Sequence, residues 1–562
     1  MKKRRPPIGI DNFEKLIKDG FYYVDKTGMI KELLENWGEV NLFTRPRRFG
    51  KSLNMSMLQH FFEIGADRSL FDGLAISAET TLCNEWQGKY PVISLTLKDC
   101  WGLDYQDALE QFAGVVSREA DRHFYLMDSE RLDEADKQTL IDMKMKRGNL
   151  ESAIMVLSGY LYKHWGQPAI VLIDEYDVPL QKAESNDYYD EMTSFISRFF
   201  SQGMKTNSNI KMAVVTGCLR IAKESIFTGF NNPRMHTIVD ESYDEWFGFT
   251  DQEVRQMLEY YGISEYYDVT REWYDGYLFG KTSVYSPWDL LNWCEQLINT
   301  SDRIPRNFWS NASGNDIIRR FADQADKQTR DQIAGLIEGG TVNKQVKLDL
   351  TYRELDDTID NLWSVLLTTG YLTTRGRNED GSYTLAIPNR EVRELFATQV
   401  DKWFKERVLD DTDGLREFFN AILDENESAM EDRLIDYMEG SISYLDVGKV
   451  EKKENFYHGL LLGMLASFKE WNVVSNREAG KGHLDILAYR RREKYAFIIE
   501  VKYSKEEADL EADAQKALNQ IDDRKYDKVF GRHLPERIVH YGIAFCKTDC
   551  RVLKEVAQDG EQ

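Results

Sequence analysis

Several features that would settle the class of this protein directly are scarce in its sequence. The 562 residues include only 6 cysteines and 8 histidines. No two cysteines are spaced as C-x-x-C and the histidines do not cluster, so the sequence indicates neither a disulfide framework nor a zinc cluster. A reduced, cytoplasmic protein is the simplest interpretation.

Long apolar runs are also missing. A membrane-spanning helix needs roughly 18 consecutive apolar residues, and the sequence has no such run. The basic start MKKRRPP is followed by an apolar stretch too short for a signal peptide. We therefore expect a soluble chain without a membrane partner.

Positive charge is in deficit. The net charge is −23, which argues against indiscriminate adhesion to nucleic acid. Residues 450–562 hold 20 Lys/Arg and 20 Asp/Glu, so this part is neutral and the acidity lies in residues 1–449. With 42% hydrophobic residues the chain can bury cores, and its length suffices for roughly three or four domains.

The chain is organised around residues 40–56, VNLFTRPRRFGKSLNMS. An apolar run at 40–43 predicts a buried strand, a loop with three arginines follows, and Gly50-Lys51-Ser52 opens an amphipathic helix. Strand, basic loop, Gly-Lys-Ser and helix is the layout of a phosphate-binding loop. Arg45 replaces the glycine that begins the generic pattern, so a chance match is the alternative.

The residue types of this loop suit a nucleoside triphosphate. Backbone N–H groups at the helix start would face phosphate oxygens, and Gly50 would let the backbone approach closely. Lys51 would reach the β- and γ-phosphates, and the Ser52 hydroxyl would ligate Mg²⁺. The predicted nucleotide contacts here are Arg45, Arg48, Phe49, Gly50, Lys51, Ser52 and Leu53.

A second apolar run ends in two acids. Residues 169–175, AIVLIDE, predict a buried parallel strand, and ligands of open α/β sheets bind at the carboxyl ends of such strands. Asp174 would hold Mg²⁺, and Glu175 would orient or deprotonate the attacking water. The alternative is that both acids simply begin a solvated loop.

A third predicted strand, residues 211–216, ends at Thr216. A polar side chain there would sense the γ-phosphate. Arg220 follows as a candidate for charge stabilisation, with an ordinary surface cation as the alternative. We predict that the nucleotide domain ends near residue 235.

The middle of the chain predicts helices and little chemistry. Thr250 and Glu253 form a capping box before a helix that ends near residue 261. Asp380-Gly381 indicates a hairpin turn, so residues 236–390 are predicted to form a helical, winged-helix-like lid. The Trp and Tyr residues of this region are interpreted as core. Residues 391–449 are predicted to be a helical linker.

A second chemical centre is predicted in residues 450–562. A helix from residue 454 carries Glu454, and a strand at 484–489 carries Asp485. The next strand, residues 495–503, carries Glu500 and Lys502. A helix with Gln520 and a last strand at 538–545 complete the pattern.

Alternation places Glu500 and Lys502 on one face of their strand. Charges at the end of a buried strand are costly unless they are paired or hold a metal. Asp485, Glu500 and the carbonyl of Val501 would make an oxygen site for Mg²⁺ or Mn²⁺. Lys502, aided by Glu454 and Gln520, would activate water against a phosphodiester. An Asp–Lys–Glu ion-pair network is the alternative.

Together the two centres resemble known families. Residues 23–27 (YVDKT), 43–53 (FTRPRRFGKSL) and 172–177 (LIDEYD) resemble the bacterial AAA-ATPase-like family, and residues 450–548 are similar to PD-(D/E)XK nuclease-superfamily domains. The missing first glycine is not a departure from this family. The resemblance implies an α/β fold, with a P-loop NTPase-type parallel sheet and a C-terminal restriction-endonuclease-like domain.

The leading hypothesis is an ATP-controlled, Mg²⁺-dependent nuclease that acts on nucleic acid, DNA rather than RNA. The resemblance implies a role in DNA processing or in defence against foreign DNA. The first alternative is a nucleotide-dependent switch or binding module with a silent nuclease fold. A homo-oligomeric ring that remodels its substrate ranks last, because no arginine finger is evident in the sequence.

Overall fold

The computed structural model describes residues 3–219, 233–309, 318, 320–321, 324–399, 411–440, 450–468, 470–479, 482–490, 495–524 and 535–557. The chain divides into two compact units. The N-terminal unit comprises Met1–Ile317 and Thr341–Glu394. The C-terminal unit comprises Ile318–Gly340 and Leu395–Gln562. Each unit is described separately below.

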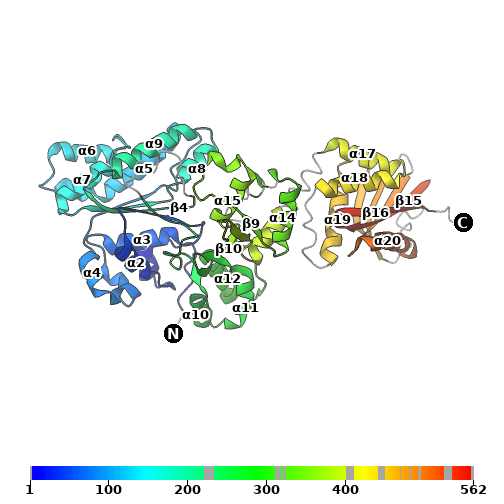
Figure 1. Ribbon diagram of the computed structural model, residues 1–562, viewed down its shortest axis with the longest axis horizontal. Helices are drawn as coiled ribbons and strands as arrows, with labels where there is room; N and C mark the ends of the chain where they lie inside the picture. The colour runs from blue at the N-terminus through cyan, green and yellow to red at the C-terminus, as the bar shows by residue number, and fades with distance from the viewer. Residues whose placement is uncertain are drawn as a thin grey trace. The chain divides into compact units, whose positions relative to one another are not determined.

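A five-stranded parallel sheet forms the centre of the N-terminal unit, in the order β2-β3-β4-β1-β5 (Figure 1). Its strands are β1 (Val40–Thr44), β2 (Val92–Thr96), β3 (Ala169–Asp174), β4 (Ile210–Gly217) and β5 (Arg234–His236). Every residue of β1 and β3 is buried. For β3 this matches a nearly continuous apolar sequence, which is typical of strands covered on both faces. In β1 the buried Asn41 is satisfied by donating to the carbonyl oxygens of Gly38 and Ala213.

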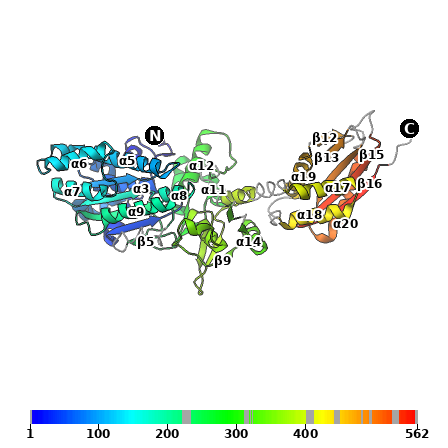
Figure 2. The ribbon, with the colours of Figure 1, turned by 90° about the horizontal axis from the view of Figure 1, so that it is seen from above.

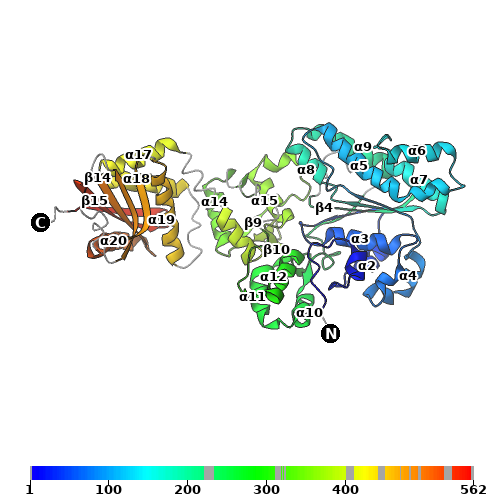
Figure 3. The ribbon, with the colours of Figure 1, turned by 180° about the vertical axis from the view of Figure 1, so that it is seen from behind.

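Helices cover both faces of this sheet (Figures 1 and 3). One face carries α5 (Tyr105–Arg122), α6 (Glu134–Lys144), α7 (Ala153–Trp165) and α9 (Tyr189–Met204). The other carries α2 (Gly28–Asn36), α3 (Lys51–Phe62) and α4 (Thr80–Trp86). Two short helices, α1 (Phe13–Lys18) and α8 (Val178–Glu184), complete this part. The predicted α/β layout of this unit is confirmed.

Residues 249–299 add a small aromatic-rich subdomain to this unit. It contains β6 (Phe249–Thr250), α10 (Asp251–Tyr261), α11 (Tyr267–Tyr274), β7 (Tyr277–Phe279), β8 (Thr282–Tyr285) and α12 (Pro287–Asn299). The predicted capping box is present, because Thr250 and Glu253 bond each other's backbone N–H groups at the start of α10.

The predicted hairpin is confirmed. It follows α15 (Ile359–Thr369) and consists of β10 (Thr373–Arg377) and β11 (Tyr383–Ala386), with β9 (Val342–Lys344) as a third strand.

The C-terminal unit is built on a mixed sheet with sequential strand order. Its strands are β12 (Asn472–Ala479), β13 (Gly482–Arg490), β14 (Tyr495–Tyr503), β15 (Arg537–Cys546) and β16 (Asp549–Val556). Only β14 and β15 pair in parallel. The prediction that residues 538–545 form the last strand is wrong, since β16 follows and pairs with β15 (Figure 2).

Helices flank this second sheet. They are α17 (Thr412–Leu423), α18 (Glu427–Gly440), α19 (Val450–Ala466) and α20 (Leu510–Arg524), with α14 (Lys327–Ile337) assigned to the same unit. Helix α20 crosses β15 very closely at Gly542. A Cβ atom there would lie 2.3 Å from the Ala514 carbonyl oxygen, so glycine is required for this close approach.

Among the described residues, no helix is long and apolar enough to cross a membrane. All six cysteines lie in described parts of the chain and none forms a disulfide.

Candidate functional sites

The loop between β1 and α3 adopts a strained, tightly turned backbone. Gly50 immediately precedes α3 and has φ 82°, a left-handed conformation that glycine adopts without steric cost. Arg48 has φ 73°, which is uncommon for a residue with a side chain. This backbone turns the chain directly from the sheet into the first turn of α3.

Lys51 is held inside this loop. Its side chain is buried, and Nζ donates to the carbonyl oxygens of Arg45 at 3.0 Å and Pro46 at 2.9 Å. Cys218 Sγ lies 3.6 Å from the same nitrogen. The ammonium group is thus positioned over the loop, where phosphate oxygens would replace its carbonyl partners.

Three predicted residues from different elements meet at the carboxyl end of the sheet. Ser52 Oγ on α3 donates to Asp174 Oδ2 at 2.6 Å, and the Thr216 hydroxyl donates to Asp174 Oδ1. Strand β4 lies between β1 and β3. Thr216, near the end of β4, and Ser52, on the helix after β1, therefore each bond a different oxygen of the Asp174 carboxylate. A hydroxyl and a carboxylate in this arrangement are suitable Mg²⁺ ligands.

Glu175 follows Asp174 with φ 55°, another left-handed backbone for a non-glycine residue. Burial raises the pKa of the Glu175 carboxyl, and the neighbouring Asp174 charge raises it further. Glu175 and Lys51 line the same pocket. A carboxyl with a raised pKa beside a phosphate-binding loop has the properties of a general base.

Among the remaining predicted loop contacts, some side chains bond the protein backbone and others line a pocket. Arg45 is fully buried and donates to the carbonyl oxygens of Thr44, His236 and Tyr243 at 2.8–3.1 Å. Its side chain anchors the loop and does not line the pocket. Phe49 and Leu53 both line the pocket, and the Phe49 side chain is buried. Arg220 lies outside the described residues.

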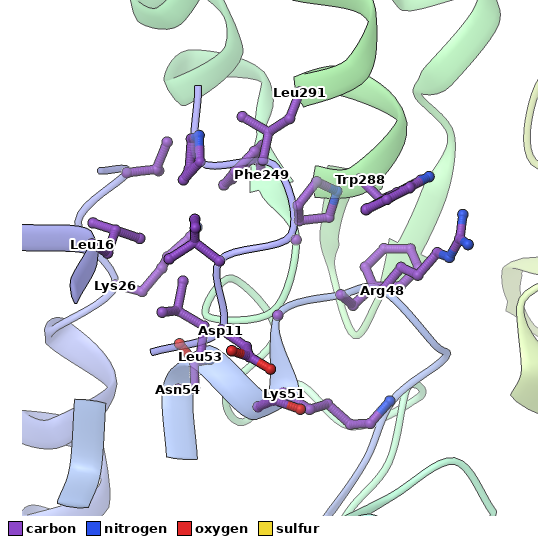
Figure 4. A pocket seen from close by; sticks show the side chains of 18 of the residues that line it. Asp11, Leu16, Lys26, Arg48, Lys51, Leu53, Asn54, Phe249, Trp288 and Leu291 are labelled. Atoms are coloured by element: carbon purple, nitrogen blue, oxygen red, sulfur yellow. The ribbon is translucent and has the colours of Figure 1, made fainter. Parts of the chain in front are cut away.

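A pocket of about 390 Å³ opens beside the loop (Figure 4). Its wall combines Arg48–Asn54 with residues from the N-terminal segment and the aromatic subdomain. The other lining residues are Pro7, Gly9, Ile10, Asp11, Leu16, Tyr22, Tyr23, Val24, Lys26, Lys98, Glu175, Trp246, Gly248, Phe249, Met257, Pro287, Trp288 and Leu291. The sequence interpretation assigned the Trp and Tyr residues of the middle region to core, and it missed the contribution of Trp288 to this wall.

In the C-terminal unit the two predicted carboxylates converge. Strands β13 and β14 pair with Ile486 opposite Ile499, and Asp485 and Glu500 directly continue this register. Asp485 Oδ2 accepts from the Val501 N–H at 2.9 Å. The Asp485 carbonyl oxygen lies 2.9 Å from His458 Nε2, on α19. Asp485 is therefore fixed at both its backbone and its side chain.

Glu500 is the most constrained group of this centre. Its side chain is 1% exposed, and Oε1 accepts from Gln520 Nε2 and from Lys502 Nζ, the latter at 3.4 Å. Oε2 has no hydrogen-bond partner among the described residues. Burial, followed by the nearby Asp485 charge, raises the pKa of Glu500 to about 8.

Lys502 completes the predicted arrangement. Its Nζ also donates to Glu454 Oε1 at 3.1 Å. Burial lowers the pKa of Lys502, but attraction to Glu500 and Glu454 outweighs it and the net shift is upward. The five predicted catalytic side chains of this unit thus lie in one connected cluster: Glu454, Asp485, Glu500, Lys502 and Gln520.

The cluster is compatible with a metal ion, although it offers few ligands. Among the described residues, no group of three or more His, Cys, Asp or Glu side chains is placed to hold a metal. The unpartnered Oε2 of Glu500 and the adjacent Asp485 carboxylate are the oxygens that would bind a cation. The Val501 carbonyl would supply a third oxygen.

Comparison with known proteins agrees with the two centres. Residues 7–227 match the family model described as "Predicted AAA-ATPase", and residues 452–555 match that of the PD-(D/E)XK nuclease superfamily. A relative, "Uncharacterized protein in vnfD 5'region" of Azotobacter chroococcum mcd 1, is 29% identical over 296 residues. That match spans 52% of this chain and 52% of the relative, about half the length of each.

A solved structure of the Aeropyrum pernix ORC1 protein in complex with DNA matches 69% of this chain and 96% of that chain, at 12% identity. Its TM-score of 0.24 is too low to support an argument. The family models and the site geometry fall on the same two regions. Residues 7–227 are therefore similar to the predicted AAA-ATPase family, and residues 452–555 are similar to domains of the PD-(D/E)XK nuclease superfamily.

Proposed function

We propose that this protein binds and hydrolyses ATP in its N-terminal unit and uses nucleotide state to control a Mg²⁺-dependent nuclease centre in its C-terminal unit. The substrate is nucleic acid, DNA rather than RNA. The role is DNA processing or defence against foreign DNA. The observation that carries the proposal is the convergence of a phosphate loop with Asp174 in one unit and of Asp485 with Glu500 in the other.

In the nucleotide site, each side chain has a distinct task. Lys51 exchanges its two carbonyl partners for phosphate oxygens. Ser52 and Asp174 would hold Mg²⁺ between them, with Thr216 fixing the second Asp174 oxygen. Glu175 accepts a proton from the attacking water, for which its raised pKa is suited.

In the nuclease centre, Mg²⁺ bound by Asp485, Glu500 and the Val501 carbonyl would neutralise phosphate charge and lower the pKa of a bound water. The protein's own residues arrange the rest. Gln520 and Lys502 fix one oxygen of Glu500 and leave the other free to bind a cation. Lys502 orients the attacking water, while Glu454 holds the Lys502 ammonium.

Cleavage assays on the purified full chain test the nuclease proposal. Plasmid and single-stranded DNA and RNA are incubated with Mg²⁺ or Mn²⁺ and with ATP, ADP or no nucleotide. Asp485→Asn should abolish metal-dependent product. The matched control is Asp509→Asn, in the exposed 3-10 helix before α20, which should cut like the unaltered chain. Absence of metal-dependent product on every substrate would contradict the proposal.

Nucleotide binding is tested separately with a fluorescent ATP analogue. Lys51→Ala should weaken binding by about a hundredfold, since it removes a charge-assisted contact to the β- and γ-phosphates. Lys89→Ala, an exposed lysine outside the pocket, is the matched control. Equal affinities in the two variants would place the nucleotide elsewhere.

A second function has one observation in its favour. Lys502 is already paired with Glu454 and Glu500, as in a charge network that needs no metal. A nucleotide-dependent switch would then use the nuclease fold only to hold nucleic acid. Calorimetric titration with Mn²⁺ distinguishes the two functions. Heat that disappears in Asp485→Asn favours the nuclease, whereas nucleic-acid binding without metal uptake favours the switch.

A further inference from the structure

Arg48 belongs to the phosphate loop and lines the pocket, yet its charged end faces elsewhere. In Figure 4 the guanidinium points toward Trp288 and away from Lys51. It stacks over the Trp288 ring at 4.5 Å from the centroid, and Nη1 donates to the Phe308 carbonyl oxygen at 3.2 Å. Arg48 therefore links the nucleotide loop to residues 307–309.

Residues 307–309 are anchored in turn by one buried acid. Glu391 Oε1 accepts the backbone N–H groups of Phe308 at 2.5 Å and Trp309 at 3.0 Å. Asn307 Nδ2 donates to the Glu391 carbonyl oxygen at 2.9 Å. Glu391 has no exposed surface. The contacts from the loop to this acid form a continuous chain from Arg48 through Phe308 to Glu391.

The chain ends at an unusual pair of buried acids. Asp289 and Glu391 lie close enough to hydrogen-bond each other, and Ser286 approaches Asp289 as well. Burial raises the pKa of both carboxyls. Burial lowers the pKa of Arg48, and the nearby Asp289 and Glu391 oppose this shift. Both acids are therefore close enough to Arg48 to interact electrostatically with its guanidinium.

The position of this chain of contacts in the sequence is informative. Trp309 precedes the first passage from the N-terminal to the C-terminal unit, at Ile317, and Glu391 precedes the last, at Glu394. The contacts join the nucleotide loop to residues that precede each of these passages in the sequence.

We propose that Arg48 reports nucleotide occupancy: when ATP binds, its guanidinium leaves Phe308 and Trp288 for phosphate oxygens, which removes one of the contacts that hold residues 307–309 and leaves Glu391 as their remaining anchor. The proposal rests on the proposed nucleotide site and specifies how that site is connected to the rest of the chain. Phosphate is the stronger partner, because a guanidinium binds it with two charge-assisted hydrogen bonds, whereas Phe308 offers one neutral carbonyl.

Hydrogen–deuterium exchange of the full chain, read by mass spectrometry, tests this with and without a non-hydrolysable ATP analogue and Mg²⁺. Peptides covering residues 50–54 report nucleotide binding, and peptides covering 306–309 report the anchored segment. We expect slower exchange at 50–54 and about tenfold faster exchange at 306–309, the change that loss of one hydrogen bond to a charged group produces.

The outcomes separate the two proposals. Slower exchange at 50–54 without a change at 306–309 overturns the role of Arg48 and leaves the nucleotide site intact. No change at 50–54 at saturating analogue overturns the nucleotide site and the role of Arg48 with it.

Variants sharpen the test. In Arg48→Gln, exchange at 306–309 should already be fast without nucleotide and should not respond to it. Lys89→Ala, on the exposed surface outside the loop and the pocket, should respond like the unaltered chain. Glu391→Ala should also exchange fast at 306–309, and Glu391→Gln keeps an acceptor oxygen should the alanine variant fail to fold. Unchanged exchange in both Glu391 variants would contradict the anchoring role.

Discussion

Replacing Glu500 with glutamine should stabilise the C-terminal unit in the absence of metal. The side chain is 1% exposed, and its pKa of about 8 lies well above its ordinary value of 4.5. At neutral pH the carboxyl is therefore ionised in the unfolded chain and mostly protonated in the folded one. Folding must take up a proton, which costs about 3 kcal/mol at pH 7.

The pH dependence has a definite sign. Because the folded pKa is raised, the carboxyl carries no penalty below pH 4.5. The penalty grows as pH rises from 4.5 to about 8 and is constant above that. The free energy of unfolding of the unaltered chain should fall across this window, and the glutamine variant should lack that slope. Loss of the charged contact to Lys502 offsets part of the gain, so we expect a net increase of about 1–3 kcal/mol at pH 7.

Scanning calorimetry at several pH values, with and without Mn²⁺, measures both effects. A cation binds the ionised carboxylate, so saturating Mn²⁺ should stabilise the unaltered chain, by about 2.7 kcal/mol at a hundred times the dissociation constant. It should not stabilise Glu500→Gln. Glu506→Gln, in the exposed turn after β14, is the matched control. A glutamine variant that melts earlier at pH 7, or that Mn²⁺ stabilises equally, would refute the reasoning.

Three further substitutions test the structure. Ser52→Ala removes the hydroxyl that bonds Asp174. In a titration with a fluorescent ATP analogue, affinity should fall about tenfold with Mg²⁺ and little with EDTA. A similar loss in EDTA would count against a role of Ser52 in metal binding. Phe49→Ala leaves a cavity between Tyr277 and Phe279, whose rings lie 4.9 and 5.0 Å away, and should lower the unfolding free energy of the N-terminal unit by about 3–5 kcal/mol in urea. Gly542→Ala places a Cβ against α20 and should cost the C-terminal unit about 1–3 kcal/mol, with loss of cleavage as Gln520 shifts; an unchanged urea midpoint would contradict the close approach.

Local sequence patterns predicted the strands and helices that carry the site because those patterns are strong. The run AIVLIDE predicts β3 with Asp174 at its end, and the capping box of Thr250 and Glu253 predicts the start of α10. The convergence of Asp485 and Glu500 was also predictable, since two adjacent antiparallel strands have a fixed register.

Features that depend on contacts distant in sequence were not predictable. The position of Arg45 in a basic loop predicts that its side chain contacts phosphate. Only the fold brings the carbonyls of His236 and Tyr243 to its guanidinium. The pocket wall was missed for the same reason, because Trp288 and Tyr22 have no periodic signal that separates a lining residue from a core residue. Glu391 lies some 340 residues from Arg48 in the sequence, and the two are linked through Phe308 in the fold.

The buried guanidinium of Arg45 makes the loop dependent on a long side chain at the position where most phosphate loops have glycine. Restoring the consensus residue would leave the Thr44, His236 and Tyr243 carbonyls without this donor and would open a void under the loop. A change toward the commoner motif would therefore weaken the protein. In this architecture the commoner glycine is the destabilising residue, and motif searches that require it would miss chains built in the same way.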